Sequence, residues 1–149
     1  FAKQKETIRV FQNRQKINLV ALREGRLAEK ENEIVLERRY AEEHQYTVGS
    51  QITLGKIKFQ VTGIATTPDY DAPLRKMSDT IVDSKNFGTA FVGKRAYIKL
   101  KQSHLAAQSE EYLYAYRLKG TTTSDDVKDF LTKYRIYFFR IIGREPVVK

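Results

Sequence analysis

Within the range Leu22–Tyr70, three short apolar patterns follow one another, and they constrain the fold more than any other part of the 149 residues. The run Glu33–Leu36 is too short for a helix and is typical of a strand. Apolar and polar residues then alternate over Gln51–Leu54, and again in a segment that starts at Ile57 and continues through Ala65. Because Gly55-Lys56 separates these two segments, they are predicted to form a hairpin.

A short helix is predicted between the first strand and the hairpin. It covers Arg38–Gln45, is mostly polar, and has Tyr40 and Ala41 as its expected buried contacts. Gly49 follows the helix within the sequence Val-Gly-Ser. We expect Gly49 to take a positive φ there, because the chain must reverse before the hairpin begins.

This order of parts carries a recognisable set of motif positions. They are Gly25-Arg26, then the Glu-Ile-Val-Leu strand and the short helix, Gly49, and Gly63 within Phe-x-Val-Thr-Gly-Ile. Together they resemble the extracytoplasmic domain of FtsX-like (MacB-like) ABC-transporter permeases. The continuation to Asp69-Tyr70 and to Asn86-Phe87-Gly88 is similar to the Gram-positive branch of that family. The resemblance covers Leu22–Val92.

The resemblance implies a location and a role. Residues 1–149 would be a single extracytoplasmic domain, a fragment of a larger membrane protein in which an N-terminal part of the fold is missing. The domain would lie on the extracellular side of the cell membrane. It would be non-catalytic, would need no cofactor, and would couple movement of the membrane helices of the same permease to a substrate or partner protein outside the cell. A cytoplasmic ATPase subunit would be an indirect partner.

Further elements are predicted on both sides of this stretch. Strands are expected from alternation or from apolar runs at Ile8–Val10, Thr89–Val92, Ala96–Lys101, Tyr112–Tyr116 and Ile136–Ile142. The spacing of Ala96 and Leu100 would also fit a helix. Glu24–Leu27 is interpreted as a tight turn, and Ala28–Asn32 as an exposed polar loop.

A later helix is predicted to begin at Ser124. Ser124 is a plausible N-cap, with Asp125 and Asp126 in the first turn, where the helix dipole favours negative charge. Apolar residues then recur from Val127 at the spacing of one helix face. Together the elements predict an α+β fold, with a mixed or largely antiparallel sheet and two to three helices. The fold would resemble the MacB-like periplasmic core domain.

The charge of the chain leaves a rival class of function open. The formal net charge is +9, which suits either an anionic membrane surface or nucleic acid. The alternative function is therefore a basic nucleic-acid-binding domain, whereas the permease interpretation has no nucleic-acid partner. The chain contains no cysteine, which excludes disulfides and thiolate metal sites.

Motifs for catalysis or metal binding are incomplete in the sequence. Gly88–Lys94 matches the first seven positions of a phosphate-binding loop, but Arg95 stands where a Ser or Thr must hold magnesium. His44 and His104 each lack a second His or Cys at metal-ligand spacing. We therefore expect no catalytic, cofactor-binding or metal-binding residue.

The candidate functional residues are Asp69, Tyr70 and Asp71, in an irregular segment that follows Pro68. Loops carry function more often than cores do, and Tyr is enriched at binding hot spots. If this loop has a role beyond joining two strands, we expect it to be a contact surface and not a catalytic site.

Overall fold

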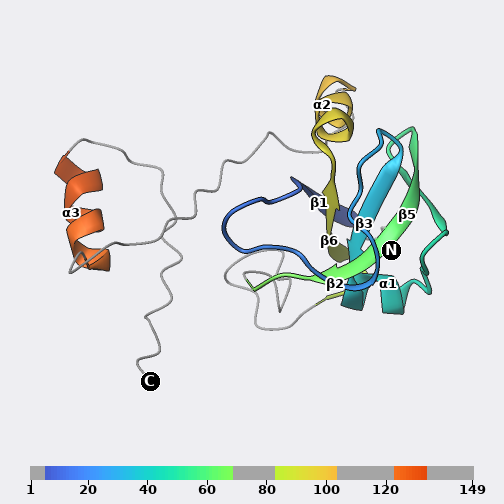
Figure 1. The fold of residues 1–149 in the computed structure, drawn as a ribbon, viewed down its shortest axis with the longest axis horizontal. Helices are drawn as coiled ribbons and strands as arrows, with labels where there is room; N and C mark the ends of the chain where they lie inside the picture. Colours follow the sequence, from blue (N-terminus) through green and yellow to red (C-terminus); the bar gives the residue numbers. More distant parts are fainter. Residues whose placement is uncertain (1–5, 69–82, 104–122, 134–149) are drawn as a thin grey trace, which may run out of the picture. The chain divides into compact units, whose positions relative to one another are not determined.

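The computed structural model describes residues 6–68, 83–103 and 123–133 (Figure 1). The chain divides into two compact units, Phe1–Gln108 and Ser109–Lys149, which are described separately. The prediction that the chain forms one domain stays a prediction. Two predicted strands, Tyr112–Tyr116 and Ile136–Ile142, lie outside the described residues.

The described part of the first unit contains six strands and two helices. Its elements are β1 (Thr7–Gln12), β2 (Ala21–Gly25), β3 (Glu33–Glu37), α1 (Arg38–Glu43), β4 (Gln51–Leu54), β5 (Ile57–Thr66), β6 (Phe87–Val92) and α2 (Lys94–Gln102). The predicted strands at the start of the chain, at Glu33, in the hairpin and before Gly93 are confirmed. Gly55 makes the hairpin turn with a φ of 63°, and Leu54 pairs with Ile57 across it.

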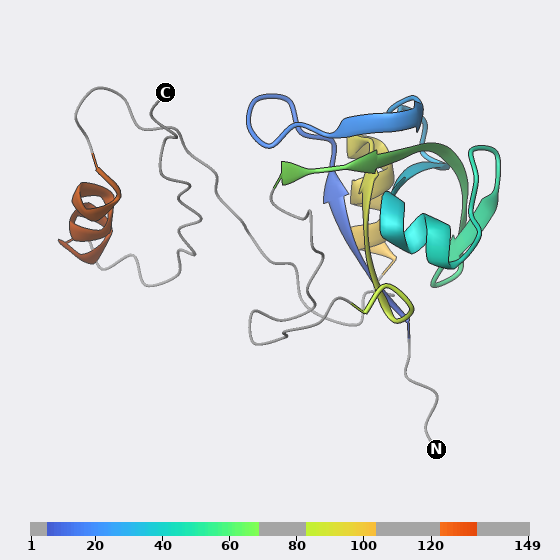
Figure 2. The same ribbon diagram turned by 90° about the horizontal axis from the view of Figure 1, so that it is seen from below.

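The six strands form one mixed sheet, in which five follow the order β1-β6-β3-β5-β2 and β4 pairs with β5 off this path. β1 is parallel to β6 and β3 is parallel to β5, whereas β3 and β6 are antiparallel. β5 is long and curved, as Figure 2 shows, and it pairs antiparallel with β4 through its first residues and with β2 through its last ones. With three helices in the described residues, this sheet confirms the predicted α+β class.

β3 lies at the centre of the sheet, and its residues alternate between two core clusters. Ile34 and Leu36 belong to the larger cluster, which α1 and α2 help to form, and Val35 belongs to a smaller one with Phe91. All five residues of β3 are buried. The apolar run of this strand therefore follows from its position, since a strand covered on both faces needs no polar alternation.

The short helix α1 is confirmed, and Tyr40 and Ala41 are its buried residues. Its N-terminus is capped by Glu37, the last residue of β3, whose carboxylate accepts hydrogen bonds from the backbone N–H groups of Arg39 and Tyr40 at 2.9 and 3.0 Å. The Tyr40 ring packs against Gly88 of β6, where an added Cβ would overlap the ring.

The predicted strand Ala96–Lys101 is wrong, because these residues belong to α2. Ala96 is buried, and Tyr97 and Leu100 pack against the larger core cluster, which is the i, i+1, i+4 spacing of a helix face. Ile98, which strand alternation would have buried, is 42% exposed. Alternation over so few residues fits both periods, and the helical option already visible in Ala96 and Leu100 is the correct one.

The predicted tight turn at Glu24–Leu27 is also wrong. Glu24 and Gly25 are part of β2 and pair with Ile64 and Gly63 of β5. The following loop is less exposed than predicted, since Ala28 is buried in the smaller core cluster. A residue outside regular structure thus supplies part of the core.

The described part of the second unit is α3 (Ser124–Lys133). Its N-cap is one residue earlier than predicted: the Thr123 hydroxyl accepts from the Asp126 N–H at 3.2 Å, and the Asp126 carboxylate accepts from the Thr123 N–H at 2.6 Å. This reciprocal pair is a capping box, with Asp in the position more often held by Glu. It holds the pKa of Asp126 below its ordinary value.

Gly49 has the expected positive φ, at 97°, and an added Cβ there would meet nothing within 4 Å. Substitution of Gly49 by Val therefore tests backbone conformation alone. We expect the variant to lose about 1 kcal/mol or more of unfolding free energy, because a β-branched residue is strained at this φ. The measurement is the urea midpoint of Gly49→Val, with Gly49→Asn as the control that should lose less, since Asn tolerates positive φ better. An unchanged midpoint for Gly49→Val would contradict the assignment.

Candidate functional site

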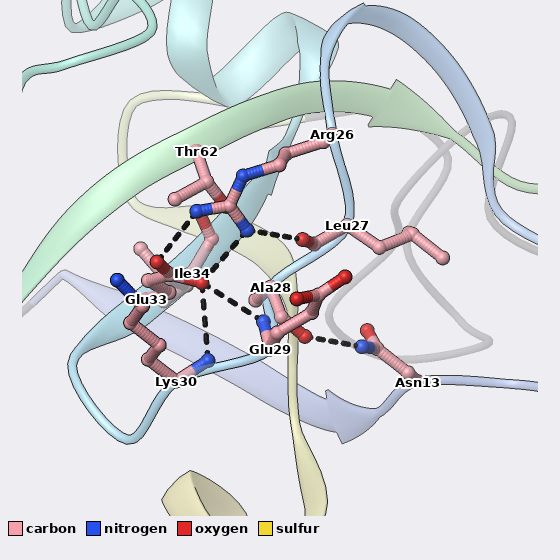
Figure 3. A network of polar contacts seen from close by, with 9 residues as sticks. All are labelled: Asn13, Arg26, Leu27, Ala28, Glu29, Lys30, Glu33, Ile34 and Thr62. Atoms are coloured by element: carbon pink, nitrogen blue, oxygen red, sulfur yellow. Dashed lines mark hydrogen bonds and ion pairs between the residues drawn. The ribbon is translucent and has the colours of Figure 1, made fainter.

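The most densely connected polar group in the described structure is the carboxylate of Glu33, the first residue of β3 (Figure 3). The side chain of Arg26 binds it through two nitrogens: Nη2 lies 2.6 Å from Oε1 and Nη1 lies 2.9 Å from Oε2. Only 4% of the Glu33 side chain is exposed, whereas half of the Arg26 side chain is exposed. The half-exposed side chain of Arg26 therefore pairs with a carboxylate that is buried in the folded protein.

The loop between β2 and β3 folds around the same carboxylate. The backbone N–H groups of Glu29 and Lys30 donate to Oε2 at 2.9 and 3.0 Å. Arg26 Nη1 also donates to the carbonyl of Leu27 at 3.0 Å. Figure 3 shows the Arg26 guanidinium and the backbone nitrogens of Glu29 and Lys30 around the Glu33 carboxylate. Both oxygens of the carboxylate are satisfied, which is what a buried charge requires.

These contacts shift the ionisation of Glu33. The hydrogen bonds from Arg26 lower the pKa of the carboxyl group from 4.5 to about 2, with smaller lowering contributions from the Glu29 and Lys30 amides and from the charge of Arg26. Burial of the carboxyl group raises its pKa, but the lowering contributions together are larger. The pKa of Arg26 is raised, first by its hydrogen bond to Glu33. Glu33 is therefore ionised in the folded protein at neutral pH.

Three of the four motif glycine and arginine positions meet beside this network. Gly25 pairs with Gly63 in the β2–β5 register. An added Cβ at Gly25 would overlap the carbonyl oxygen of Thr62, and one at Gly63 would lie 2.6 Å from the carbonyl oxygen of Arg26. Arg26 in turn donates its backbone N–H to the Thr62 carbonyl at 2.9 Å. The two glycines thus allow β2 and β5 to approach closely enough to place Arg26 over Glu33, while Gly49 acts separately at its own turn.

The chemistry available to this network is structural. The carboxylate of Glu33 is fully engaged, so it offers no free oxygen to a substrate or a metal ion. Among the described residues, no group of three His, Cys, Asp or Glu side chains could hold a metal ion.

The segment that resembles a phosphate-binding loop lies largely within β6, where Gly88–Val92 pair with neighbouring strands. His44 is the C-cap residue of α1, and its Nε2 lies 3.1 Å from the carbonyl oxygen of Lys85.

An open groove of about 700 Å³ lies between α1, β2 and β5. Its walls include charges of both signs around an apolar floor: Arg23, Glu24, Arg38, Glu42, Ala41 and Ile64. Arg38 and Glu42 already form an exposed ion pair at 3.0 Å. The rest of the lining comes from Gln45, Tyr46 and Thr47, which follow α1.

The residues predicted from the sequence as a contact loop, Asp69, Tyr70 and Asp71, lie outside the described residues. Sequence reasoning missed Glu33 and the groove. A signal for Glu33 was present, because an acidic residue that opens a fully apolar strand must find a partner if the strand is buried. The spacing of residues in the sequence did not identify Arg26 as the partner of Glu33. It also did not indicate that β2 and α1 line the same groove.

Comparison with protein-family models, with curated proteins and with solved structures finds no match to this chain. None of the helices in the described ranges is both long enough and apolar enough to cross a bilayer.

The lowered pKa of Glu33 predicts a specific pH dependence of stability. A carboxylate with a depressed folded pKa contributes stability above its unfolded pKa and loses it as the pH falls through the folded value. We expect Glu33→Gln to be clearly less stable than the wild type at pH 7, and the difference in urea midpoint to shrink between pH 4.5 and about 2.

The matched control is Glu42→Gln, which removes an acid from an exposed ion pair and should change the midpoint little at any pH. A difference between wild type and Glu33→Gln that stays constant down to pH 2 would contradict the assignment.

Proposed function

We propose that this chain is a non-catalytic extracytoplasmic domain of an FtsX-like ABC-transporter permease of the Gram-positive type. The domain lies on the extracellular side of the cell membrane and is joined to the membrane helices of the same permease. It transmits their movement to a substrate or partner protein outside. A cytoplasmic ATPase subunit acts on it only indirectly.

One observation carries this proposal. The positions on which the family resemblance rests include Gly25, Arg26 and Gly63, and these three meet at a single point where β2, β5 and the loop before β3 are held together. The two glycines allow the backbones of β2 and β5 to approach closely, and Arg26 pairs with the buried carboxylate of Glu33. A resemblance carried by such positions supports a shared fold and, through it, a shared role.

The described chemistry is consistent with a mechanical role. The strongest polar network joins consecutive parts of the sheet, and its charges are neutralised within the fold. A domain that transmits movement needs this kind of internal connection, because a loosely packed sheet would deform before it moved a partner.

A basic nucleic-acid-binding domain is the second candidate, and α2 is the observation in its favour. This helix carries four basic residues and no acidic one. Phosphate contacts by Lys and Arg make affinity fall steeply with salt. A mobility shift of duplex or single-stranded nucleic acid that weakens sharply between low and physiological salt would support this candidate over the permease.

Protease accessibility on intact cells tests the proposed function. Protease added outside cells that express the full-length protein should cleave within the 149 residues, because the domain faces outward. The controls are a known surface protein, which must be digested, and a cytoplasmic protein, which must be spared. Complete protection of the domain while the surface control is digested would overturn the proposed location and, with it, the function.

A further inference from the structure

The helix α2 presents two different faces. Ala96 is buried, and Tyr97 and Leu100 pack against the larger core cluster, so one face is fixed to the sheet. The opposite face is exposed along its whole length and consists of Lys94, Arg95, Ile98, Lys99, Lys101 and Gln102. Figure 1 shows α2 at the end of the sheet opposite α1, and Figure 2, which looks from below, has α1 in front and α2 farther away. Among the described residues of the first unit, α1 and α2 thus lie at opposite ends of the sheet.

The charges at the start of α2 oppose the helix dipole, whereas Lys99 and Lys101 in its last turn agree with it. Lys94 and Arg95 occupy the first turn, at the end where the helix dipole is positive and acidic residues are favoured. The first turn contains no acid, and the N-cap Gly93 makes no side-chain capping bond. Arg95 and Lys99 are like charges four residues apart, an arrangement that weakens a helix. An anionic surface against this face would offset the unfavourable charge in the first turn and the repulsion between Arg95 and Lys99.

Ile98 indicates what kind of anionic surface fits. It is 42% exposed and lies one turn from Lys94, Arg95 and Lys101. It also lines a shallow hollow with Arg95, Lys99, Gln102 and one acidic residue, Glu31. Phosphate groups of nucleic acid are contacted by charged and polar side chains, which would leave Ile98 in water. A phospholipid bilayer has anionic headgroups that can bind the basic side chains. It also has an apolar acyl-chain region just beneath, which the isoleucine side chain can enter, as in interfacial helices.

We propose that the exposed face of α2 docks onto the surface of an anionic phospholipid bilayer, with Ile98 entering the headgroup region. The cations around it bind the lipid phosphates. This goes beyond the proposed function, because it concerns a peripheral contact made by the folded domain and needs no membrane helix.

The chain contains no tryptophan, so Ile98→Trp introduces a single fluorescent probe at the centre of the face. Vesicles of phosphatidylglycerol and phosphatidylcholine should shift its emission to shorter wavelength, whereas vesicles of phosphatidylcholine alone should not. The matched control is Val48→Trp, at an exposed apolar residue of similar exposure, 43%, in the turn between α1 and β4. No shift at position 98 at low salt, or an equal shift at both positions, would overturn the proposal.

Charge removal provides the second measurement. The variant K94Q/R95Q/K99Q should bind anionic vesicles about tenfold or more weakly in co-sedimentation, because each cation near such a surface contributes appreciably to affinity. The control K16Q/K56Q/K58Q removes the same charge from exposed lysines elsewhere and should bind nearly as well as the wild type. All six residues are exposed, so both variants should stay folded, with thermal midpoints within a few degrees of the wild type.

Equal losses in the two triple variants would show that net charge alone drives binding, and would overturn the proposal. Duplex DNA titrated against the same proteins tests the other class of polyanion. If α2 binds DNA more tightly than anionic vesicles and Ile98→Ser leaves both interactions unchanged, the helix is a polyanion site and the bilayer proposal is wrong.

Discussion

Glu33 brings a negative charge to the start of the central strand, where only 4% of its side chain reaches solvent, and the first unit depends on how that charge is paired. An isolated buried carboxylate would cost several kcal/mol or would take up a proton. Here it stays ionised because Arg26 binds both oxygens and two backbone amides complete the shell. The pair therefore fixes the position of the loop before β3 relative to β2 and β5.

The same constraint explains why two glycines are needed at Gly25 and Gly63. The backbones of β2 and β5 come together closely beside Arg26, and a side chain at either glycine would meet a carbonyl oxygen of the opposite segment. The close approach and the ion pair are thus one structural feature. Its parts come from the continuous stretch between Gly25 and Glu33 and from Gly63 of β5, which is distant in the sequence.

Local patterns in the sequence were sufficient for part of this structure. The strand at Glu33, the helix with Tyr40 and Ala41, and the hairpin at Gly55 each depend on neighbouring residues, and each was predicted correctly. The helix α2 was mispredicted because Ala96 and Leu100 fit both the strand period and the helix period, and only tertiary packing selects between them. The partner of Glu33 could not be predicted, because it depends on the register of β2 against β5, which no local pattern contains. The contact loop at Asp69–Asp71 lies outside the described residues and stays a prediction.

A double-mutant cycle on Arg26 and Glu33 tests most directly whether this ion pair organises the fold. Arg26→Gln leaves the carboxylate buried and unpaired, whereas Arg26→Gln with Glu33→Gln removes the charge as well and keeps an acceptor for the two amides. At pH 7 we expect the double variant to have a higher urea midpoint than Arg26→Gln alone, because it contains no unpaired buried charge. A double variant whose losses equal the sum of the two single losses would show that Arg26 and Glu33 act independently, and would contradict the account.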